Sequence, residues 1–320
     1  MKYEEWLQEW ICNYVKMTAK QRTYIRYSEI INKHIGPNMG DKEINDLTTM
    51  DLQKFIAELL ACGNIKTGKG LSSSAVNSII TVIQSSFSAA YGLGIIENNP
   101  SKNIKRPKLV ERRIECFSVA EQRDIEKTIL SDNRLYMIGI IVCLYTGLRI
   151  GELLALTWQD IDFSNSTLSV TKTCYDGKDV DGNFGRIIDA PKTASSQRVI
   201  PLPKQIKELL KKIKKQSNSE WVITKRGELI SVRTYQRNFS TLLDKLHLEH
   251  RGFHALRHTF ATRAIECGMD VKTLSEILGH KNPTITLNRY THSLMEHKRN
   301  MMNRIGQLYG LSQNKRQVRL

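Results

Sequence analysis

The C-terminal half of the sequence carries a series of cationic and proton-transferring side chains that ends at a tyrosine. In chain order these residues are Arg149, Lys192, His254, Arg257, His280 and Tyr290. A phosphodiester under nucleophilic attack builds negative charge on its two non-bridging oxygens, and planar guanidinium groups donate to such oxygens in pairs. Arg149 and Arg257 are therefore candidates to bind a phosphate during a transfer reaction.

The other members of the series could move protons or attack the phosphate. Tyr290 would be the nucleophile, and because the ordinary pKa of tyrosine is about 10, its deprotonation needs a base or strong local positive charge. His254 is the candidate base, or at least a phosphate donor, and His280 would also donate to the phosphate. The alternative for His280 is a structural role at the end of a helix. Glu152, one helical turn after Arg149, is expected to orient the site.

This ordered series resembles the motifs of the tyrosine recombinase (phage integrase) family, and in particular its mobile-element integrases. The matching segments are Thr146-Gly147-Leu148-Arg149, Pro191-Lys192-Thr193, His254-Ala255-Leu256-Arg257, Leu278-Gly279-His280 and Arg289-Tyr290. Each segment alone is common, but all five in this order are specific. Glu97-Asn98-Asn99-Pro100 is similar to the end of the family's core-binding domain, so the resemblance covers essentially the whole chain.

The resemblance implies a site-specific DNA recombinase that forms a 3′-phosphotyrosyl link at Tyr290 and proceeds through a Holliday junction. By family analogy Lys192, on a β-hairpin, would protonate the leaving 5′ oxygen, although Lys172 and Lys178 lie on neighbouring stretches. The phosphotyrosine keeps the energy of the broken bond, so a 5′-hydroxyl from another strand can reseal it without ATP. The implied partners are double-stranded DNA attachment sites.

Neither a metal nor a nucleotide cofactor is expected. His254 and His258 have the spacing of metal ligands on a helix, but Ala255 stands where the zinc-protease motif has glutamate. No acidic cluster near the series could hold two magnesium ions. The segment 63–69 resembles a phosphate-binding loop, but Gly70 stands where serine or threonine would hold magnesium, and the segment follows a helix instead of a strand.

The charge of the chain agrees with a nucleic-acid partner. Lys and Arg number 48 against 32 Asp and Glu, a net charge of +16 over 320 residues. An excess of this size indicates a polyanion, most often nucleic acid, and no apolar run is long enough to span a membrane. Residues 1–106 carry a net charge of +3, whereas residues 107–320 carry +13.

A basic stretch divides the chain into two predicted domains. We expect a helical DNA-binding domain over 1–100, a basic interdomain linker over 101–115 and a catalytic domain over 116–320. Pro100 and Pro107 keep the stretch 101–113 from continuing a helix, so it should be extended. Its cations are expected to contact backbone phosphates. They are Lys102, Lys105, Arg106, Lys108, Arg112 and Arg113.

The elements that must position these residues can be read from apolar spacing. Helices are predicted over 3–17, with Trp6, Trp10 and Tyr14 on one stripe, and over 21–34, from Thr48 onward and over 72–91. Four helices in about 100 residues make a small bundle. The resemblance implies the same architecture, a mostly α chain with an N-terminal SAM-like core-binding bundle and an α+β catalytic domain.

The catalytic domain is expected to combine helices with a small antiparallel sheet. Strands are predicted where Val, Ile and Thr alternate, over 158–173 and 186–201, with a turn or hairpin extension over 175–185 between them. A helix should begin after Ser118, with Glu121 completing a capping box. Further helices are expected over 134–146, 203–215, 231–247, 254–267, 270–278, 283–291 and 294–309.

The last predicted helix and the cysteines lead to expectations about assembly and about the cellular compartment. The last helix places Leu294, Met301, Ile305 and Leu308 on one face, which either closes its own domain or docks on a neighbouring protomer. Docking would give a homotetramer on two DNA sites, formed from free monomers. The six cysteines lack metal-binding spacing and are read as reduced thiols of a cytoplasmic protein, prokaryotic or from a phage or mobile element.

Three alternatives remain open. A Xer-like resolvase of chromosome or plasmid dimers would share the chemistry, but the long hairpin segment favours an integrase. A type IB topoisomerase would use the same steps on one duplex. A non-enzymatic DNA-binding relative would usually have lost one of the six residues of the series from Arg149 to Tyr290.

Because the sequence starts directly at the core-binding domain, arm-site binding is in doubt, and a directionality factor is possible.

Overall fold

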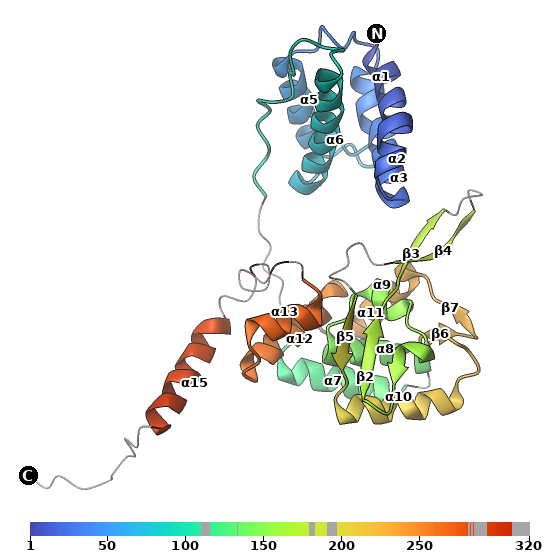
Figure 1. Ribbon diagram of the computed structural model, residues 1–320, viewed down its shortest axis with the longest axis vertical. Helices are drawn as coiled ribbons and strands as arrows, with labels where there is room; N and C mark the ends of the chain where they lie inside the picture. The colour runs from blue at the N-terminus through green and yellow to red at the C-terminus, as the bar shows by residue number, and fades with distance from the viewer. Residues whose placement is uncertain are drawn as a thin grey trace, which may run out of the picture. The chain divides into compact units, whose positions relative to one another are not determined.

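The computed structural model describes residues 1–109, 116–132, 134–178, 183–190, 197–280, 282, 284 and 293–308. The chain divides into two compact units, Met1–Arg112 and Arg113–Leu320, and each is described by itself (Figure 1). Helices dominate and the sheets are small and antiparallel, which confirms the predicted fold class. Over the described ranges, no helix is both long and apolar enough to cross a membrane.

The first unit is a bundle of helices, as the apolar spacing predicts. Its helices are α1 (Tyr3–Trp10), α2 (Lys16–Thr18), α3 (Gln21–Ile30), α4 (Gly36–Met39), α5 (Thr49–Cys62) and α6 (Ser73–Gly92). Two π-helical turns, η1 (Ile11–Val15) and η2 (Ile31–Ile35), join α1 to α2 and α3 to α4. The side-chain oxygen of Thr48 accepts the backbone N–H of Asp51, so α5 begins where the sequence indicates.

The stripe predicted for the first helix is present, although its last member lies at the edge of the core. Trp6 and Trp10 are buried, and the ring centroid of Tyr14 lies 6.2 Å from that of Trp6. Tyr14 itself is 40% exposed. It belongs to the π-helical turn η1, which holds more residues than an α-helical turn and was not predicted from a constant 3.6-residue period.

The basic stretch after the bundle is not an extended spacer along its whole length. Ile104 is buried in the core of the first unit. The guanidinium of Arg106 lies on α6, where Nη1 donates to the Asn77 carbonyl at 3.2 Å and Nη2 to Gln84 Oε1 at 2.7 Å. The side-chain amide of Asn77 in turn donates to the Pro107 carbonyl. Residues 101–107 therefore pack against the bundle, because apolar Ile104 and the long arginine find partners there.

The second unit combines helices with small antiparallel sheets. Its helices are α7 (Val119–Leu130), α8 (Ile138–Thr146), α9 (Ile150–Leu154), α10 (Lys204–Gln216), α11 (Val232–Lys245), α12 (His254–Glu266), α13 (Val271–Leu278) and α15 (Ser293–Leu308), with the 3-10 turns η3 (Leu135–Met137) and η4 (Trp158–Asp160). The capping box of Ser118 and Glu121 is confirmed. The short helix α9 was not predicted, and the helix expected over 283–291 lies outside the described residues.

The predicted strands are present but shorter and more numerous. They are β1 (Ile161–Asp162), β2 (Thr167–Val170), β3 (Thr173–Lys178), β4 (Phe184–Asp189), β5 (Arg198–Pro201), β6 (Thr224–Lys225) and β7 (Glu228–Leu229). The side chain of Asp162 accepts the backbone N–H groups of Ser164 and Asn165, which turns the chain and ends β1. This local turn chemistry broke the strand predicted over 158–173.

The strands form three antiparallel sheets. One has the order β1-β2-β5 and pairs Leu168 with both Ile161 and Ile200. The second is the hairpin β3–β4, in which Gly177 lies opposite Gly185, so the predicted hairpin extension is confirmed where it is described. The third, β6–β7, was not predicted because each strand has only two residues.

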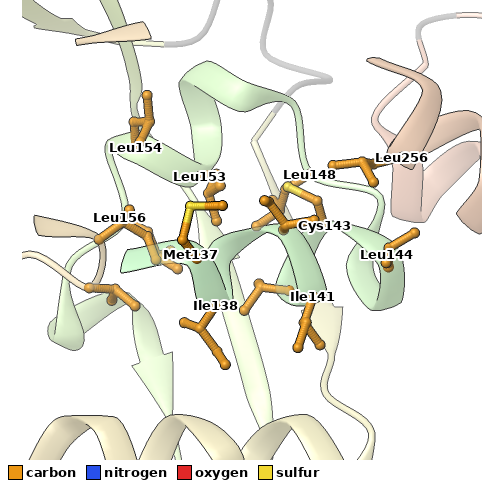
Figure 2. Close-up of a cluster of buried hydrophobic side chains, with 14 of the residues drawn as sticks. Met137, Ile138, Ile141, Cys143, Leu144, Leu148, Leu153, Leu154, Leu156 and Leu256 are labelled. Carbon is orange, nitrogen blue, oxygen red and sulfur yellow. The ribbon is translucent and has the colours of Figure 1, made fainter. Parts of the chain in front are cut away.

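Helix α8 lies within the core of the second unit. It is apolar on every face, as expected of a helix buried all round. Figure 2 shows its side chains among those of neighbouring segments, including Leu148, Leu153 and Leu256. These three leucines are adjacent in sequence to Arg149, Glu152 and Arg257. Packing of the core therefore anchors the segments that carry the candidate site.

Candidate active site

A sharp turn after α8 begins the site. Gly147 ends the helix with a φ of +66°, and a Cβ atom there would lie 2.6 Å from Cδ1 of Phe260. Only glycine fits both the left-handed backbone and the close approach of Phe260. The turn buries Leu148 in the core and leaves the Arg149 side chain 37% exposed. The Gly147 carbonyl is also used, because it accepts a hydrogen bond from Arg257 Nη1 at 2.8 Å.

Arg149 is held in place by the first turn of α9. Its backbone N–H donates to Glu152 Oε2 at 2.9 Å, and its Nη1 donates to Glu152 Oε1 at 2.7 Å. Its Nη2 donates to the Gly279 carbonyl at 3.3 Å. The contacts of Glu152 agree with its expected orienting role. One carboxylate thus caps the helix and fixes the guanidinium of the residue that begins it.

Arg257 lies on α12 and is almost fully covered, with 2% of its surface exposed. Besides its bond to Gly147, its Nη2 donates to the Leu278 carbonyl at 2.5 Å. Arg149 and Arg257 therefore bind consecutive carbonyls, those of Gly279 and Leu278, at the C-terminal end of α13. Carbonyls at a helix C-terminus carry partial negative charge, which stabilises two neighbouring cations there.

The two histidines of the series begin α12 and follow α13. His254 is exposed, and its ring lies edge-on to that of buried His258, with centroids 4.7 Å apart. His280 is half-buried and directly follows Gly279, whose φ is +64°. The backbone N–H of His280 donates to the Ser275 carbonyl, so the main chain of His280 makes the helix-end contact of the alternative reading, while the role of its ring stays a prediction. In the described part of the chain, no three metal-binding side chains cluster.

Lys172, which the sequence leaves as an alternative to Lys192 for the general acid, forms an ion pair in this structure. Lys172 Nζ lies 3.2 Å from Asp160 Oδ2, donates to Thr157 Oγ1 at 3.3 Å and stands over the ring of Trp221. Burial raises the pKa of Asp160, but hydrogen bonds from Thr157 and Lys172 outweigh it and lower that pKa. The Lys172 side chain is still 34% exposed, so this pairing leaves it a candidate for the general acid beside Lys192. Lys192 itself and the side chain of Lys178 lie outside the described residues.

The remaining candidates divide between the described and the undescribed parts. Tyr290, Arg112 and Arg113 lie outside the described residues. Lys102, Lys105 and Lys108 are exposed. Arg106 is exposed too, although its guanidinium is bonded to α6. The structure therefore brings Arg149, Arg257 and the His280 backbone together, and the roles of all the candidates stay predictions.

Sequence reasoning missed one arginine of the site. The Arg198 side chain, at the start of β5, is only 6% exposed. Its Nη1 and Nη2 donate to Glu152 Oε1 and Oε2 at 3.1 and 2.8 Å, and its Nε donates to the Ile277 carbonyl at 2.5 Å. Strand periodicity could have indicated that Arg198 is buried. Alternate residues of a strand share a face, and Ile200, two residues after Arg198, is buried.

Glu152 lies between the two cationic side chains. Its own side chain is 4% exposed, and burial raises its pKa. Hydrogen bonding and charge attraction from Arg198, together with the charge of Arg149, outweigh burial and hold the pKa below its ordinary value. The site therefore contains an ionised carboxylate that binds two guanidinium groups.

Comparison with known proteins gives consistent matches over both units. The profile of the Phage integrase family matches residues 121–297, and that of the phage integrase N-terminal SAM-like domain matches residues 2–60. The chain is 28% identical over 330 residues to a "Tyrosine recombinase XerC-like" of Caldanaerobacter subterraneus subsp. tengcongensis, covering 95% of this chain and 82% of the relative. It is 26% identical over 305 residues to the ICEBs1 integrase of Bacillus subtilis (strain 168), covering 92% and 80%.

A solved structure extends the match to three dimensions. The fold is similar to that of the Tn1549 transposon integrase in complex with a circular intermediate DNA, with a TM-score of 0.80. The two share 23% sequence identity, over 95% of this chain and 99% of the solved one. The similarity therefore includes the helical bundle as well as the unit that carries Arg149 and Arg257.

Proposed function

The chain belongs to the phage integrase family of tyrosine recombinases, and on that premise we propose how its own residues cleave and rejoin DNA. Tyr290 Oη attacks a phosphodiester, a bond forms between phosphorus and the tyrosine oxygen, and the 5′ oxygen of the broken strand leaves. A 5′-hydroxyl of another strand then attacks the 3′-phosphotyrosine and releases Tyr290. The number of phosphodiester bonds is unchanged, so no ATP is consumed.

The observation that carries this proposal is the meeting of two guanidinium groups at the end of α13. Arg149 and Arg257 bind consecutive carbonyls directly before His280, which supports their binding one phosphate together. His254, exposed at the first turn of α12, would accept the tyrosine proton, and His280 would donate to a non-bridging oxygen. Lys192 would protonate the leaving 5′ oxygen.

A recombination assay without metal or ATP tests this function. The site DNA is first identified by sequencing DNA that is covalently trapped on the protein in cells. Purified protein should then exchange strands between two such sites in excess EDTA, because side-chain cations stabilise the transition state in place of a metal. Activity that is lost in EDTA and restored by magnesium would overturn the proposed site.

The same assay separates the alternatives. A topoisomerase would relax supercoiled DNA but would neither join two sites nor resolve a synthetic Holliday junction.

We propose an integrase of a mobile element that acts in a prokaryotic cytoplasm. The extended hairpin β3–β4 and the similarity to the ICEBs1 and Tn1549 integrases support this proposal. Trapped DNA should then join an element end to a chromosomal site, whereas a Xer-like resolvase would trap one resolution site. An accessory directionality factor would bias integration against excision.

The basic stretch after the bundle is proposed to bind DNA phosphates. Lys102, Lys105 and Lys108 are exposed there, and the proposal extends to Arg106, Arg112 and Arg113. Replacing Lys105 with glutamine should lower the slope of log K against log salt by about one and weaken all sequences alike.

A binding titration over several salt concentrations measures this slope. Lys33→Gln is the control, because Lys33 pairs with Glu29 on the surface of the same unit. A Lys105 variant that changes the preferred sequence while its slope stays native would indicate base contact instead.

Helix α15 is proposed to join protomers into a homotetramer on two DNA sites. Of its described apolar side chains, Met302 is 65% exposed, Ile305 is 44% exposed and Met301 is half-buried. A face that its own unit leaves open suits docking on a neighbouring catalytic unit, and such head-to-tail contacts close a ring. The free protein should be monomeric, because the patch is small and DNA must bring protomers together.

Deleting residues 293–320 should leave binding to a single site largely intact and abolish strand exchange between two sites. Gel-shift titration and the two-site assay measure the two properties separately. Docking between protomers is refuted if the truncated protein still recombines two sites. It is also refuted if the melting temperature of the truncated protein without DNA is much lower, because the helix would then serve its own unit.

A further inference from the structure

We propose that Arg198 is a positioning residue for strand cleavage, which holds Arg149 and the segment before His280 in one rigid arrangement. The proposal rests on the proposed function of the site, but it concerns a residue outside the matched motifs. Arg198 does not need to touch DNA in this role. It acts through Glu152 and through the main chain at the end of α13.

The first observation is a row of three carbonyls. Ile277, Leu278 and Gly279 are consecutive at the end of α13, and each accepts a hydrogen bond from a different arginine. Ile277 accepts from Arg198 Nε at 2.5 Å, Leu278 from Arg257 Nη2 at 2.5 Å and Gly279 from Arg149 Nη2 at 3.3 Å. Arg198 therefore binds the same turn as the two proposed phosphate ligands.

The second observation is that Arg198 completes the coordination of Glu152. Oε1 accepts from Arg149 Nη1 and Arg198 Nη1, and Oε2 accepts from the Arg149 backbone N–H and Arg198 Nη2. Four N–H donors thus bind the two oxygens of a carboxylate side chain that is only 4% exposed. Paired parallel bonds of this kind fix direction as well as distance.

These contacts link three elements of the catalytic unit. Arg198 belongs to β5, Glu152 to α9 and Ile277 to α13, so a single side chain connects segments far apart in the sequence. Replacing a buried ion pair by apolar groups is often neutral for stability, so stability alone is a weak reason for such an arrangement. Orientation of Arg149 and His280 toward one phosphate gives it a role in the reaction.

Replacing Arg198 with methionine should slow cleavage without weakening DNA binding. Misplacing a catalytic group by about 1 Å can cost roughly 100-fold in rate, and we expect a loss of about that size. The rate is measured in a single turnover on a nicked suicide duplex that carries the recovered site, at saturating protein. Arg134→Met is the control for the substitution itself, because Arg134 also binds both carboxylate oxygens of one residue, Asp132, at a more exposed position outside the site.

The pH profile separates positioning from a general loss of structure. The groups that face the Glu152 carboxylate are Arg149 at the start of α9, Arg198 on β5 and the Cys143 thiol on α8. Burial is the main cause of the raised pKa of Cys143, and the charge of Glu152 raises it further. Without Arg198, its hydrogen bonds and its charge no longer lower the pKa of Glu152, so that pKa rises. Glu152 is then protonated at a higher pH, and the protonated form holds Arg149 less firmly. The acid limb of the cleavage rate should move to higher pH in Arg198→Met and return toward its native position in Arg198→Lys.

A double-mutant cycle tests whether Arg198 acts through Glu152. If it does, Arg198→Met should slow cleavage less in the Glu152→Gln background than in the native protein, and the loss that remains reflects the bond to the Ile277 carbonyl. Fully multiplied losses would overturn the proposal, as would a native rate and pH profile in Arg198→Met. If Arg198→Met does not fold, Arg198→Gln, which keeps a donor but no charge, carries the test, and a native rate with an unmoved acid limb in that variant contradicts the proposal. Failure of the native protein to cleave would instead refute the proposed function.

Discussion

Replacing Tyr290 with phenylalanine is expected to abolish covalent attachment to DNA while leaving site binding unchanged. The substitution removes only the oxygen that would bond to phosphorus, so the contacts that hold the duplex remain. On a nicked suicide substrate the native protein should form a complex that resists SDS, and the variant should form none. Gel electrophoresis under denaturing conditions measures this directly.

Two other tyrosines, half-buried Tyr145 and buried Tyr235, allow a matched control. Burial raises the pKa of Tyr145, which lies on α8, and raises the pKa of Tyr235 well above its ordinary value. A tyrosine that resists ionisation is a poor nucleophile, so Tyr145→Phe should form the adduct as the native protein does. An SDS-resistant complex formed by Tyr290→Phe would show that another residue attacks the DNA.

Replacing Arg257 with lysine should reduce the cleavage rate by roughly 1,000-fold with little change in DNA affinity. Arg257 spans the carbonyls of Gly147 and Leu278 with its two terminal nitrogens, and a single ammonium group cannot reproduce that fork. Loss of one preorganised donor to a developing anion typically costs about 100- to 1,000-fold in rate. Single-turnover cleavage and a binding titration distinguish the two effects.

A second arginine on the same helix controls for the chemistry of the substitution. Arg263 pairs with Glu266 and donates to the Phe117 carbonyl at 3.0 Å, away from the row of carbonyls at the end of α13. Arg263→Lys should therefore cleave at close to the native rate. Equal losses in both variants, or a native rate in Arg257→Lys, would contradict a direct role of Arg257 at the phosphate.

The fold could be predicted from sequence where a single local rule decides the structure. Thr48 and Ser118 begin helices because their side chains cap them, and α8 is buried because it is apolar on every face. Such a rule did not predict the π-helical turn η1, and it failed over 158–173, where Asp162 turned the chain. In both places, hydrogen bonds that periodicity does not encode decided the structure.

The site could be predicted only as a set of residues. The order of the motifs identified Arg149 and Arg257, but their meeting at the carbonyls of Leu278 and Gly279 depends on how α13 packs in the unit. Arg198 was missed because a lone arginine in a strand resembles a surface residue until its partners are known. Tertiary packing, not local sequence, brings it to Glu152.

The position of the covalent link tests the central claim most directly. Protein trapped on a nicked suicide duplex in excess EDTA is digested with nuclease and trypsin, and the peptide that carries the nucleotide is identified by mass spectrometry. Cleavage after Arg289 and Lys298 yields a peptide of residues 290–298 that contains Tyr290 as its one tyrosine. We expect the nucleotide on Tyr290 of that peptide. A nucleotide on any other peptide, or no covalent link with DNA that is still cleaved, would contradict the account.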